Sequence, residues 1–170
     1  MWIGSWADYN NGRLHGDWCD AAAEPEELWK DIHHILATSH EEIAEDWGVF
    51  DYDEFGGFTV GEAETVETIT TVARGIAQHG EAFSLWAELH DADPEMLANF
   101  EDAYLGEYDS AEDWARELMD DTGVEQTLNE AIPEGLRPYV QIDYEQFARD
   151  ARGSDIHFED HQEGAAIRWR

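Results

Sequence analysis

The stretch SAEDWARELMDD, Ser110–Asp121, shows the clearest helical pattern in the sequence. Ser110 is a typical N-cap residue, and Asp113 three positions later makes a weaker variant of the capping box. The apolar residues recur at helical spacing and form one stripe: Ala111, Trp114, Ala115 and Leu118. The acidic residues fall largely on the other faces: Glu112, Asp113, Glu117, Asp120 and Asp121. The stretch therefore predicts an amphipathic helix that buries its stripe and turns acids toward solvent.

The spacing of these acids is unfavourable for the helix itself. Asp113 and Glu117 are four residues apart, about 6 Å along the helix axis. Like charges at that spacing repel by a few tenths of a kcal/mol per pair. A helix selected for stability alone would interleave lysines, so the pattern indicates that the acids serve another purpose.

Elements on both sides of this helix predict an α+β fold. Helical spacing or helix-start signals recur in these ranges: 25–36, 62–80, 81–90, from 94 onward, and 144–152. Leu89 is expected to point inward from the helix near 81–90. Strands are expected at Trp2–Trp6 and Arg13–Cys19, joined as a hairpin through Asn10-Asn11-Gly12, at Trp47–Tyr52, and in a terminal hairpin of Ile156–Phe158 with Ala165–Trp169.

Composition indicates a folded chain outside membranes. The 170 residues are 42% hydrophobic and 12% aromatic, which is too rich in core-forming residues for a disordered acidic tail. The sequence has no run of about 18 apolar residues to span a membrane and no signal-peptide pattern at its beginning. A single cysteine, Cys19, cannot form an internal disulfide, so we expect a cytoplasmic protein.

The net charge is the most informative property of the composition. Forty-one Asp and Glu face nine Lys and Arg, which gives −32. The excess is −12 in residues 1–61, −9 in 62–103 and −11 in 104–170, so it belongs to the folded chain. Duplex DNA carries about one charge per 1.7 Å, and on that scale 32 charges match roughly 54 Å of duplex. Composition alone favours equally an imitation of DNA and a halophilic protein hydrated by its acids.

The sequence gives little support for an enzyme or for a metal site. It contains no HExxH, no cysteine cluster, no GxSxG and no glycine-rich phosphate loop, and we expect no cofactor. DNA binding is excluded because the excess of anions would repel phosphate. The segment from Asp51 to Glu62 partly matches a calcium loop, with ligands at Asp51, Asp53, Thr59 and Glu62 and a glycine at Gly56, but Phe55 replaces a required ligand. A calcium-binding module remains a third, weaker alternative.

Three stretches resemble the ArdA-type antirestriction proteins. These stretches are WADYNNGRLHGDW (Trp6–Trp18), FDYDEFGG (Phe50–Gly57) and, most specifically, NFEDAYLGEYDSAEDWARELMDDTG (Asn99–Gly123); DYEQFARD (Asp143–Asp150) and the following Ser154-Asp155 resemble the C-terminal part of the same family. The resemblance covers nearly the whole chain in the same order. It implies a protein of three small subdomains: a β-rich part at 1–61, a helical part at 62–103, and an α+β part at 104–170 that carries the dimer contact.

The resemblance also implies the function and favours DNA mimicry over the halophilic alternative. Such proteins imitate bent DNA, form homodimers, are typically encoded on mobile elements, and occupy the methyltransferase core of type I restriction-modification enzymes without catalysis. No nucleic acid or membrane is expected as a partner. The acids predicted to replace phosphates are Asp51, Asp53, Glu54, Glu62, Glu64, Glu67, Glu101, Asp102, Glu107, Asp109, Glu112, Asp113, Glu117, Asp120 and Asp121.

Overall fold

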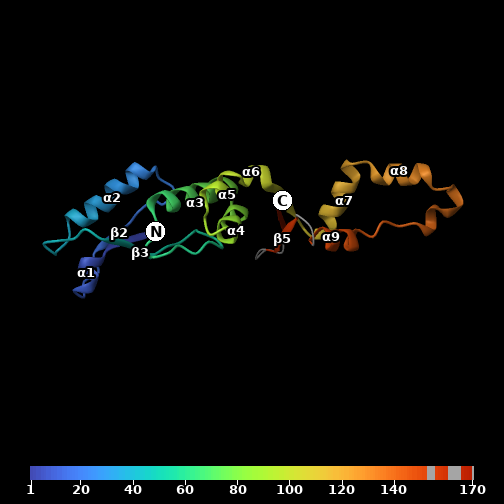
Figure 1. The fold of residues 1–170 in the computed structure, drawn as a ribbon. Helices are drawn as coiled ribbons and strands as arrows, with labels where there is room; N and C mark the ends of the chain where they lie inside the picture. Colours follow the sequence, from blue (N-terminus) through green and yellow to red (C-terminus); the bar gives the residue numbers. More distant parts are fainter. Residues whose placement is uncertain (153–155, 161–165, 170) are drawn as a thin grey trace. The chain divides into compact units, whose positions relative to one another are not determined.

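A computed structural model describes residues 1–152, 156–160 and 166–169. The chain divides into two compact units, Met1–Phe100 and Glu101–Arg170, here called unit 1 and unit 2. Each unit combines helices with a small antiparallel sheet (Figure 1). The predicted α+β class is therefore confirmed. The separation of a β-rich part from a helical part within residues 1–103 stays a prediction.

The sheet of unit 1 has its first strand in the centre. Strand β1 (Trp2–Ser5) pairs antiparallel with β2 (Gly16–Trp18) on one side and with β3 (Trp47–Asp51) on the other. Gly4 lies opposite Gly16 and Gly48, so a row of glycines crosses the sheet. A Cβ atom on Gly16 would lie 2.1 Å from the carbonyl oxygen of Ile3. The row is required because backbone and aromatic rings approach the sheet too closely for side chains.

The predicted hairpin between the first two strands is wrong in its details. A short helix, α1 (Trp6–Asn10), stands between them, because the hydroxyl of Ser5 caps it by accepting from the backbone N–H of Asp8. The first strand therefore ends one residue earlier than predicted, and the second is confined to Gly16–Trp18. The turn at Asn11-Gly12 follows the helix, with Gly12 at φ +77°.

Helices cover the sheet and extend the core of unit 1. They are α2 (Pro25–Ala37), α3 (Val66–His79), α4 (Glu81–Leu89), α5 (Pro94–Ala98) and α6 (Phe100–Ala103), of which the last continues into unit 2. Helix α3 ends at His79, before the predicted cap Gly80 with φ +68°, but it begins at Val66 and not at residue 62, because the Thr65 side chain caps it. The largest fully buried side chains of this unit include Ile3, Leu28, Ile32, Ile69, Trp86 and Phe100. Contacts of α2 with β1 and with α3 connect the sheet to the helices.

Leu89 does not point inward, which corrects the prediction for α4. Its side chain is 43% exposed. The helix ends at Leu89, and Asp91 and Ala92 then adopt positive φ. The ring of the next residue, His90, packs edge-on against Trp86, with ring centroids 4.1 Å apart.

The sole cysteine of the chain lies directly after β2. Cys19 is buried, and its backbone N–H donates to the carbonyl oxygen of Met1. Burial raises the pKa of the Cys19 thiol to about 11, and the carboxylates of Asp31 and Asp17 add to the shift. The thiol is therefore protonated at neutral pH.

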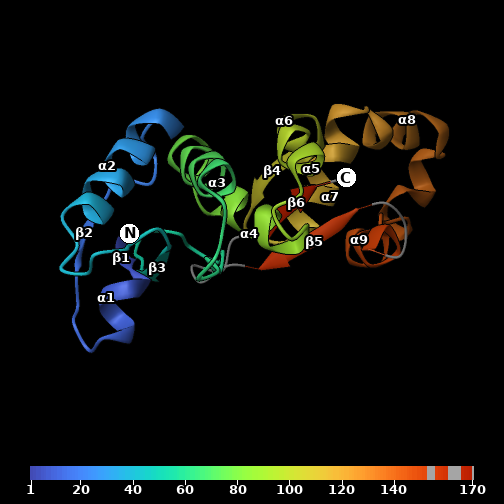
Figure 2. The same ribbon diagram turned by 60° about the vertical axis from the view of Figure 1, so that its left-hand side comes forward.

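Unit 2 places helices around a second antiparallel sheet (Figure 2). Its strands are β4 (Tyr104–Tyr108), β5 (His157–Asp160) and β6 (Ala166–Trp169), with β6 between the other two. Its helices are α7 (Ala111–Asp121), α8 (Val124–Ala131), the 3-10 helix η1 (Glu134–Tyr139) and α9 (Tyr144–Arg152). The terminal hairpin and the helices after Ser110 and Asp143 are confirmed, whereas β4 and α8 were not expected. Ala165, predicted to begin the last strand, lies outside the described residues.

The core of unit 2 is small and depends on Trp114. The indole is 4% exposed and lies on α7 facing α9, where Ala148 and Ala151 are also buried. The ring of Phe147 stacks on it at 5.9 Å between centroids, and Phe158 of β5 meets it edge-on at 5.3 Å. The apolar stripe read from the sequence thus forms this core, except that Leu118 at its far end is 37% exposed.

Candidate partner-binding surface

Helix α7 presents an acidic face to solvent. Ser110 caps the helix as predicted, because its Oγ accepts from the backbone N–H of Asp113 and donates to the Asp113 carboxylate at 2.6 Å. Glu117 lies one turn further and accepts from the Tyr108 hydroxyl of β4 at 3.3 Å. All the predicted acids of this helix are exposed: Glu112, Asp113, Glu117, Asp120 and Asp121. The structure therefore gathers these acids on one element beside β4.

Four further predicted acids lie just before α7. Glu101 and Asp102 are on α6, Glu107 is on β4, and Asp109 follows that strand. All four side chains are exposed. They continue the acidic surface of α7 along the chain within unit 2.

The predicted acids of unit 1 lie on the segment from β3 to α3. Asp51 ends the strand, and its carboxylate accepts from the backbone N–H of Tyr52 at 2.9 Å. Asp53 accepts in the same way from Glu54, which has φ +64°. Glu62 is exposed before α3, Glu67 is exposed in its first turn, and Glu64 is half-buried. These acids form a second group, in a unit separate from α7.

The segment from Asp51 to Glu62 is shaped by the core of unit 1. Phe55, at the position where a calcium loop needs an oxygen ligand, is 4% exposed and packs against Tyr52 and Phe58. The carbonyl oxygen of Glu62 accepts from the backbone N–H of Val49 in β3. Among the described residues there is no group of three or more acids, histidines or cysteines arranged to hold a metal ion.

Four arginines in the described part of the chain form ion pairs with acids. Arg13 pairs with Glu41, Arg74 with Glu24, Arg116 with Glu112, and Arg149 with Glu145, all between 2.5 and 2.8 Å. The charge of Glu112, a predicted site residue, is thus partly compensated by a neighbour on the same helix. These exposed pairs contribute little to stability, and they leave the negative charge dominant over both units.

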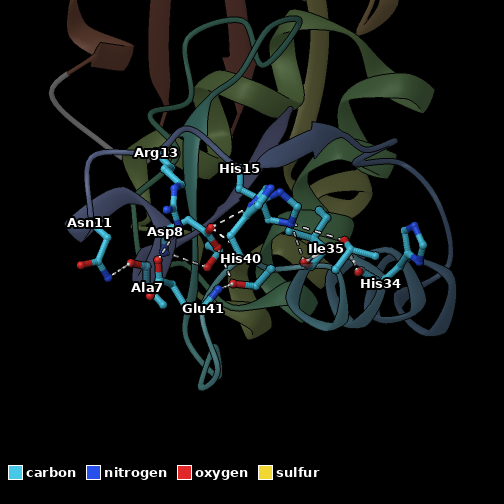
Figure 3. Close-up of polar contacts among 12 residues, drawn as sticks. Ala7, Asp8, Asn11, Arg13, His15, His34, Ile35, His40 and Glu41 are labelled. Atoms are coloured by element: carbon cyan, nitrogen blue, oxygen red, sulfur yellow. Dashed lines mark hydrogen bonds and ion pairs between the residues drawn. The ribbon is translucent and has the colours of Figure 1, made fainter.

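Asp8 differs from every other described acid because it is fully buried. Its carboxylate accepts from the Ser39 hydroxyl at 2.5 Å and from the backbone N–H of His40 at 3.2 Å. The Nδ1 atom of His40 lies 3.3 Å from the same carboxylate (Figure 3). Asp8 is therefore hydrogen-bonded inside the protein, whereas the surface acids face solvent.

Hydrogen bonding controls the pKa of Asp8. Burial alone would raise it, but the Ser39 and Ser5 hydroxyls and the His40 backbone N–H outweigh burial, and His15 adds to their effect. The pKa of Asp8 is held well below its ordinary value of 3.8. A depressed pKa stabilises the folded state above the unfolded pKa, and that contribution is lost as pH falls through the folded one.

We expect Asp8→Asn to lower stability at pH 7 and to make it less sensitive to acid. The free energy of unfolding should differ most between the two proteins at neutral pH, and the difference should shrink steadily below about pH 4. Urea unfolding at pH 7, 4 and 3 measures it, with Asp17→Asn, which replaces an exposed carboxylate, as the control. A difference that stays constant with pH would show that the charge of Asp8 does not stabilise the fold.

Unit 2 also contains an open groove with a mixed lining that includes the acids Glu112 and Glu125. The groove has a volume of about 450 Å³ and lies between α7, α8 and the segment around η1. Leu128, Ile132, Val140 and Ile142 contribute apolar surface, and Arg116 and Arg137 contribute guanidinium groups. Leu136, Tyr139 and Val140 of the adjoining segment are 55%, 83% and 47% exposed. Exposed apolar side chains gathered in one short segment favour a contact site there.

Two of these features were not predicted from the sequence. Asp8 is one of 41 acids, and only its contact with Ser39 and His40, more than 30 residues away, distinguishes it. The groove arises from three separate segments, and its apolar lining residues, Leu128, Ile132, Val140 and Ile142, form no periodic pattern that would have marked it in the sequence.

Comparison with known proteins identifies the family. The sequence model of the antirestriction protein (ArdA) family matches residues 1–163 of this chain. No curated protein matches the chain. None of the described helices has an apolar stretch long enough to cross a bilayer. Since the match covers both units almost completely, the chain belongs to the ArdA family of antirestriction proteins.

Proposed function

We propose that this ArdA-family protein acts as a DNA mimic that competes with DNA for the binding site of a type I restriction-modification enzyme. The observation that carries the proposal is the placement of charge: among the described acidic side chains, Asp8 alone is buried. The other acidic side chains are wholly or partly exposed on both units, so they are accessible to the cations of a partner. An enzyme groove that binds phosphates provides those cations.

The proposed mechanism needs no catalysis. Carboxylates of the two units replace phosphates at the methyltransferase core, and release of counterions and direct ion pairs supply the binding energy. Because each carboxylate replaces one of many phosphates, the binding energy is distributed. High salt should weaken the complex, as it weakens binding of DNA itself.

A displacement assay tests this function. A type I methyltransferase core is loaded with fluorescent target duplex and titrated with the protein at moderate salt. Displacement near stoichiometric amounts supports competition for the DNA site. Absence of displacement from several such enzymes, with circular dichroism showing the protein folded in the same buffer, would contradict the proposal.

We further propose that a second copy of the chain covers the groove of unit 2, giving a homodimer. The exposed apolar side chains around η1 support this contact, because burial of apolar surface favours association. Of the acids on α7, Glu112 lines the groove, whereas Asp113, Glu117, Asp120 and Asp121 do not and remain available to the enzyme.

Tyr139→Asp is expected to weaken self-association about 100-fold, since the buried ring would be replaced by a charge that must be desolvated. Sedimentation equilibrium at several concentrations measures the dimer constant. Leu14→Asp is the matched control: Leu14 is 74% exposed and lies in unit 1, so its dimer constant should equal that of the wild type. Equal loss in both variants would place the contact elsewhere.

A further inference from the structure

An open slot in unit 1 lies between α2, the start of β3 and the start of α3. Its volume is about 340 Å³, and the side chains that line it include Trp29 of α2, Trp47 of β3 and, at the start of α3, Glu64, Val66 and Glu67. Both indoles are half-buried, so each keeps part of its ring surface open to solvent. The slot shares no residue with the groove of unit 2.

The two indoles form adjacent walls of the slot at nearly a right angle. The ring centroids of Trp29 and Trp47 are 6.0 Å apart, and the ring planes meet at 85°. The face of an indole attracts a cation through its quadrupole, more strongly than the face of Tyr or Phe does. His33 of the same helix stacks on Trp29 at 5.7 Å between centroids, so a ligand contacts this indole from the slot. Two rings set in this way can contact one cationic group from two sides.

Two carboxylates define the charge of the ligand. Glu64 is half-buried and Glu67 is exposed, and none of the described residues that line the slot is basic. The N-terminus of a helix attracts anions, but the chain itself supplies acceptors there. The Thr65 hydroxyl accepts from the backbone N–H of Thr68 at 3.1 Å, and Glu64 accepts from that of Thr65 at 3.2 Å. The remaining negative charge therefore favours a cation.

The walls of the slot determine the kind of cation. Calcium needs about six to eight oxygen ligands, whereas the slot combines two carboxylates with apolar and aromatic walls, and the described residues include no group that could hold a metal ion. A purely apolar ligand would cover the carboxylates without pairing them. A guanidinium group fits both features, because it is planar and weakly hydrated, stacks on aromatic rings and donates two parallel N–H groups to a carboxylate.

We propose that the slot binds the guanidinium group of an arginine side chain presented by a partner protein. The group stacks against Trp29 and Trp47 and donates to Glu64 and Glu67. Because the slot is open, it accepts the end of a side chain whose backbone stays outside. The inference goes beyond DNA mimicry, since the sugar-phosphate backbone has no aromatic surface and the contact is made by indole faces as well as by charge.

An NMR titration of the full chain tests the slot directly. The probe is N-acetyl-arginine amide, at about 150 mM salt to screen non-specific attraction. Of the eight indole N–H signals, those of Trp29 and Trp47 should shift and saturate; Trp29→Phe and Trp47→Phe assign them. N-acetyl-lysine amide should bind about fivefold more weakly, because its ammonium group is strongly hydrated and does not stack.

Substitutions separate the aromatic contact from apolar packing. Trp29→Leu keeps an apolar side chain without a ring face and should weaken binding of the probe about tenfold, whereas Trp29→Phe should weaken it less. Trp18→Leu is the matched control: Trp18 is 57% exposed and does not line the slot, so affinity should stay at the wild-type value. Glu64→Gln combined with Glu67→Gln should weaken binding about threefold, and this variant serves if Trp29→Leu does not fold.

The inference is overturned if the signals of Trp29 and Trp47 do not saturate, or if the exposed Trp18 shifts equally, which would indicate attraction to the net charge alone. Wild-type affinity in Trp29→Leu would also overturn it. Tighter binding of tetramethylammonium would assign the slot to a rounded ammonium ion, and tighter binding of free L-arginine would assign it to the free amino acid; either result contradicts the proposal. Because the titration contains no restriction enzyme, failure of the displacement assay contradicts the mimicry and leaves this result standing.

Discussion

A variant in which Asp109, Glu117, Asp120 and Asp121 are all replaced by the corresponding amides, Asn or Gln, should displace DNA about 30-fold less well. The four carboxylates are exposed on and beside α7, and each exposed ion pair with the enzyme contributes on the order of 0.5 kcal/mol. Four such pairs amount to roughly 2 kcal/mol, which corresponds to about 30-fold in affinity. The single variants should each lose about twofold, and the losses should multiply.

The same variant is expected to be more stable than the wild type. Glu117 lies three and four residues before Asp120 and Asp121, so removal of these charges relieves repulsion worth a few tenths of a kcal/mol per pair. A thermal melt and the displacement assay therefore move in opposite directions, which excludes unfolding as the cause of weaker binding. A single substitution that abolishes displacement while the protein stays folded would contradict distributed mimicry.

Trp114→Ala should unfold unit 2 and leave unit 1 folded. Truncating a buried Trp costs about 3–5 kcal/mol, and a unit of about 70 residues rarely has more stability than that. The substitution removes the ring that Phe147 and Phe158 contact. The apolar residues buried around it are alanines, which cannot close the cavity. The loss should therefore exceed the stability of the unit.

Two-dimensional NMR distinguishes the outcomes, because amide signals of residues 101–170 should collapse to unfolded positions while those of 1–100 keep their dispersion. Trp18→Ala is the matched control, since Trp18 is 57% exposed and its loss should leave both sets of signals in place. Simultaneous collapse of both units after Trp114→Ala would show that they depend on each other for stability.

Local signals in the sequence predicted much of the fold. Ser110 fixed the start of α7, the sequence His79-Gly80 fixed the end of α3, and Pro94 fixed the start of α5. The errors have equally local causes. The hydroxyl of Ser5 caps a helix where the Asn-Gly turn had suggested a plain hairpin, and α4 ends at Leu89, which leaves that side chain exposed at the end of the helix.

The sequence predicted which type of residue forms the candidate surface, but not how each of these residues is placed in the fold. The sequence shows that acids such as Asp120 fall on the polar face of a helix, and the structure finds them exposed. It does not show that Asp8 turns inward, because that depends on donors supplied by Ser39 and His40 across the tertiary fold. The groove beside η1 was not predicted for the same reason: residues from α7 to Tyr144 form it together.

Alkylation of Cys19 reports how often unit 1 opens. With a pKa near 11, about one thiol in ten thousand is ionised at pH 7, and the buried sulfur is shielded from reagents besides. Because the chain has no other cysteine, each alkylated molecule marks one excursion in which unit 1 exposed this strand end. The alkylated fraction, measured by mass over time, would give the frequency of these openings. The measurement does not depend on the eight tryptophans of the chain or on events in unit 2.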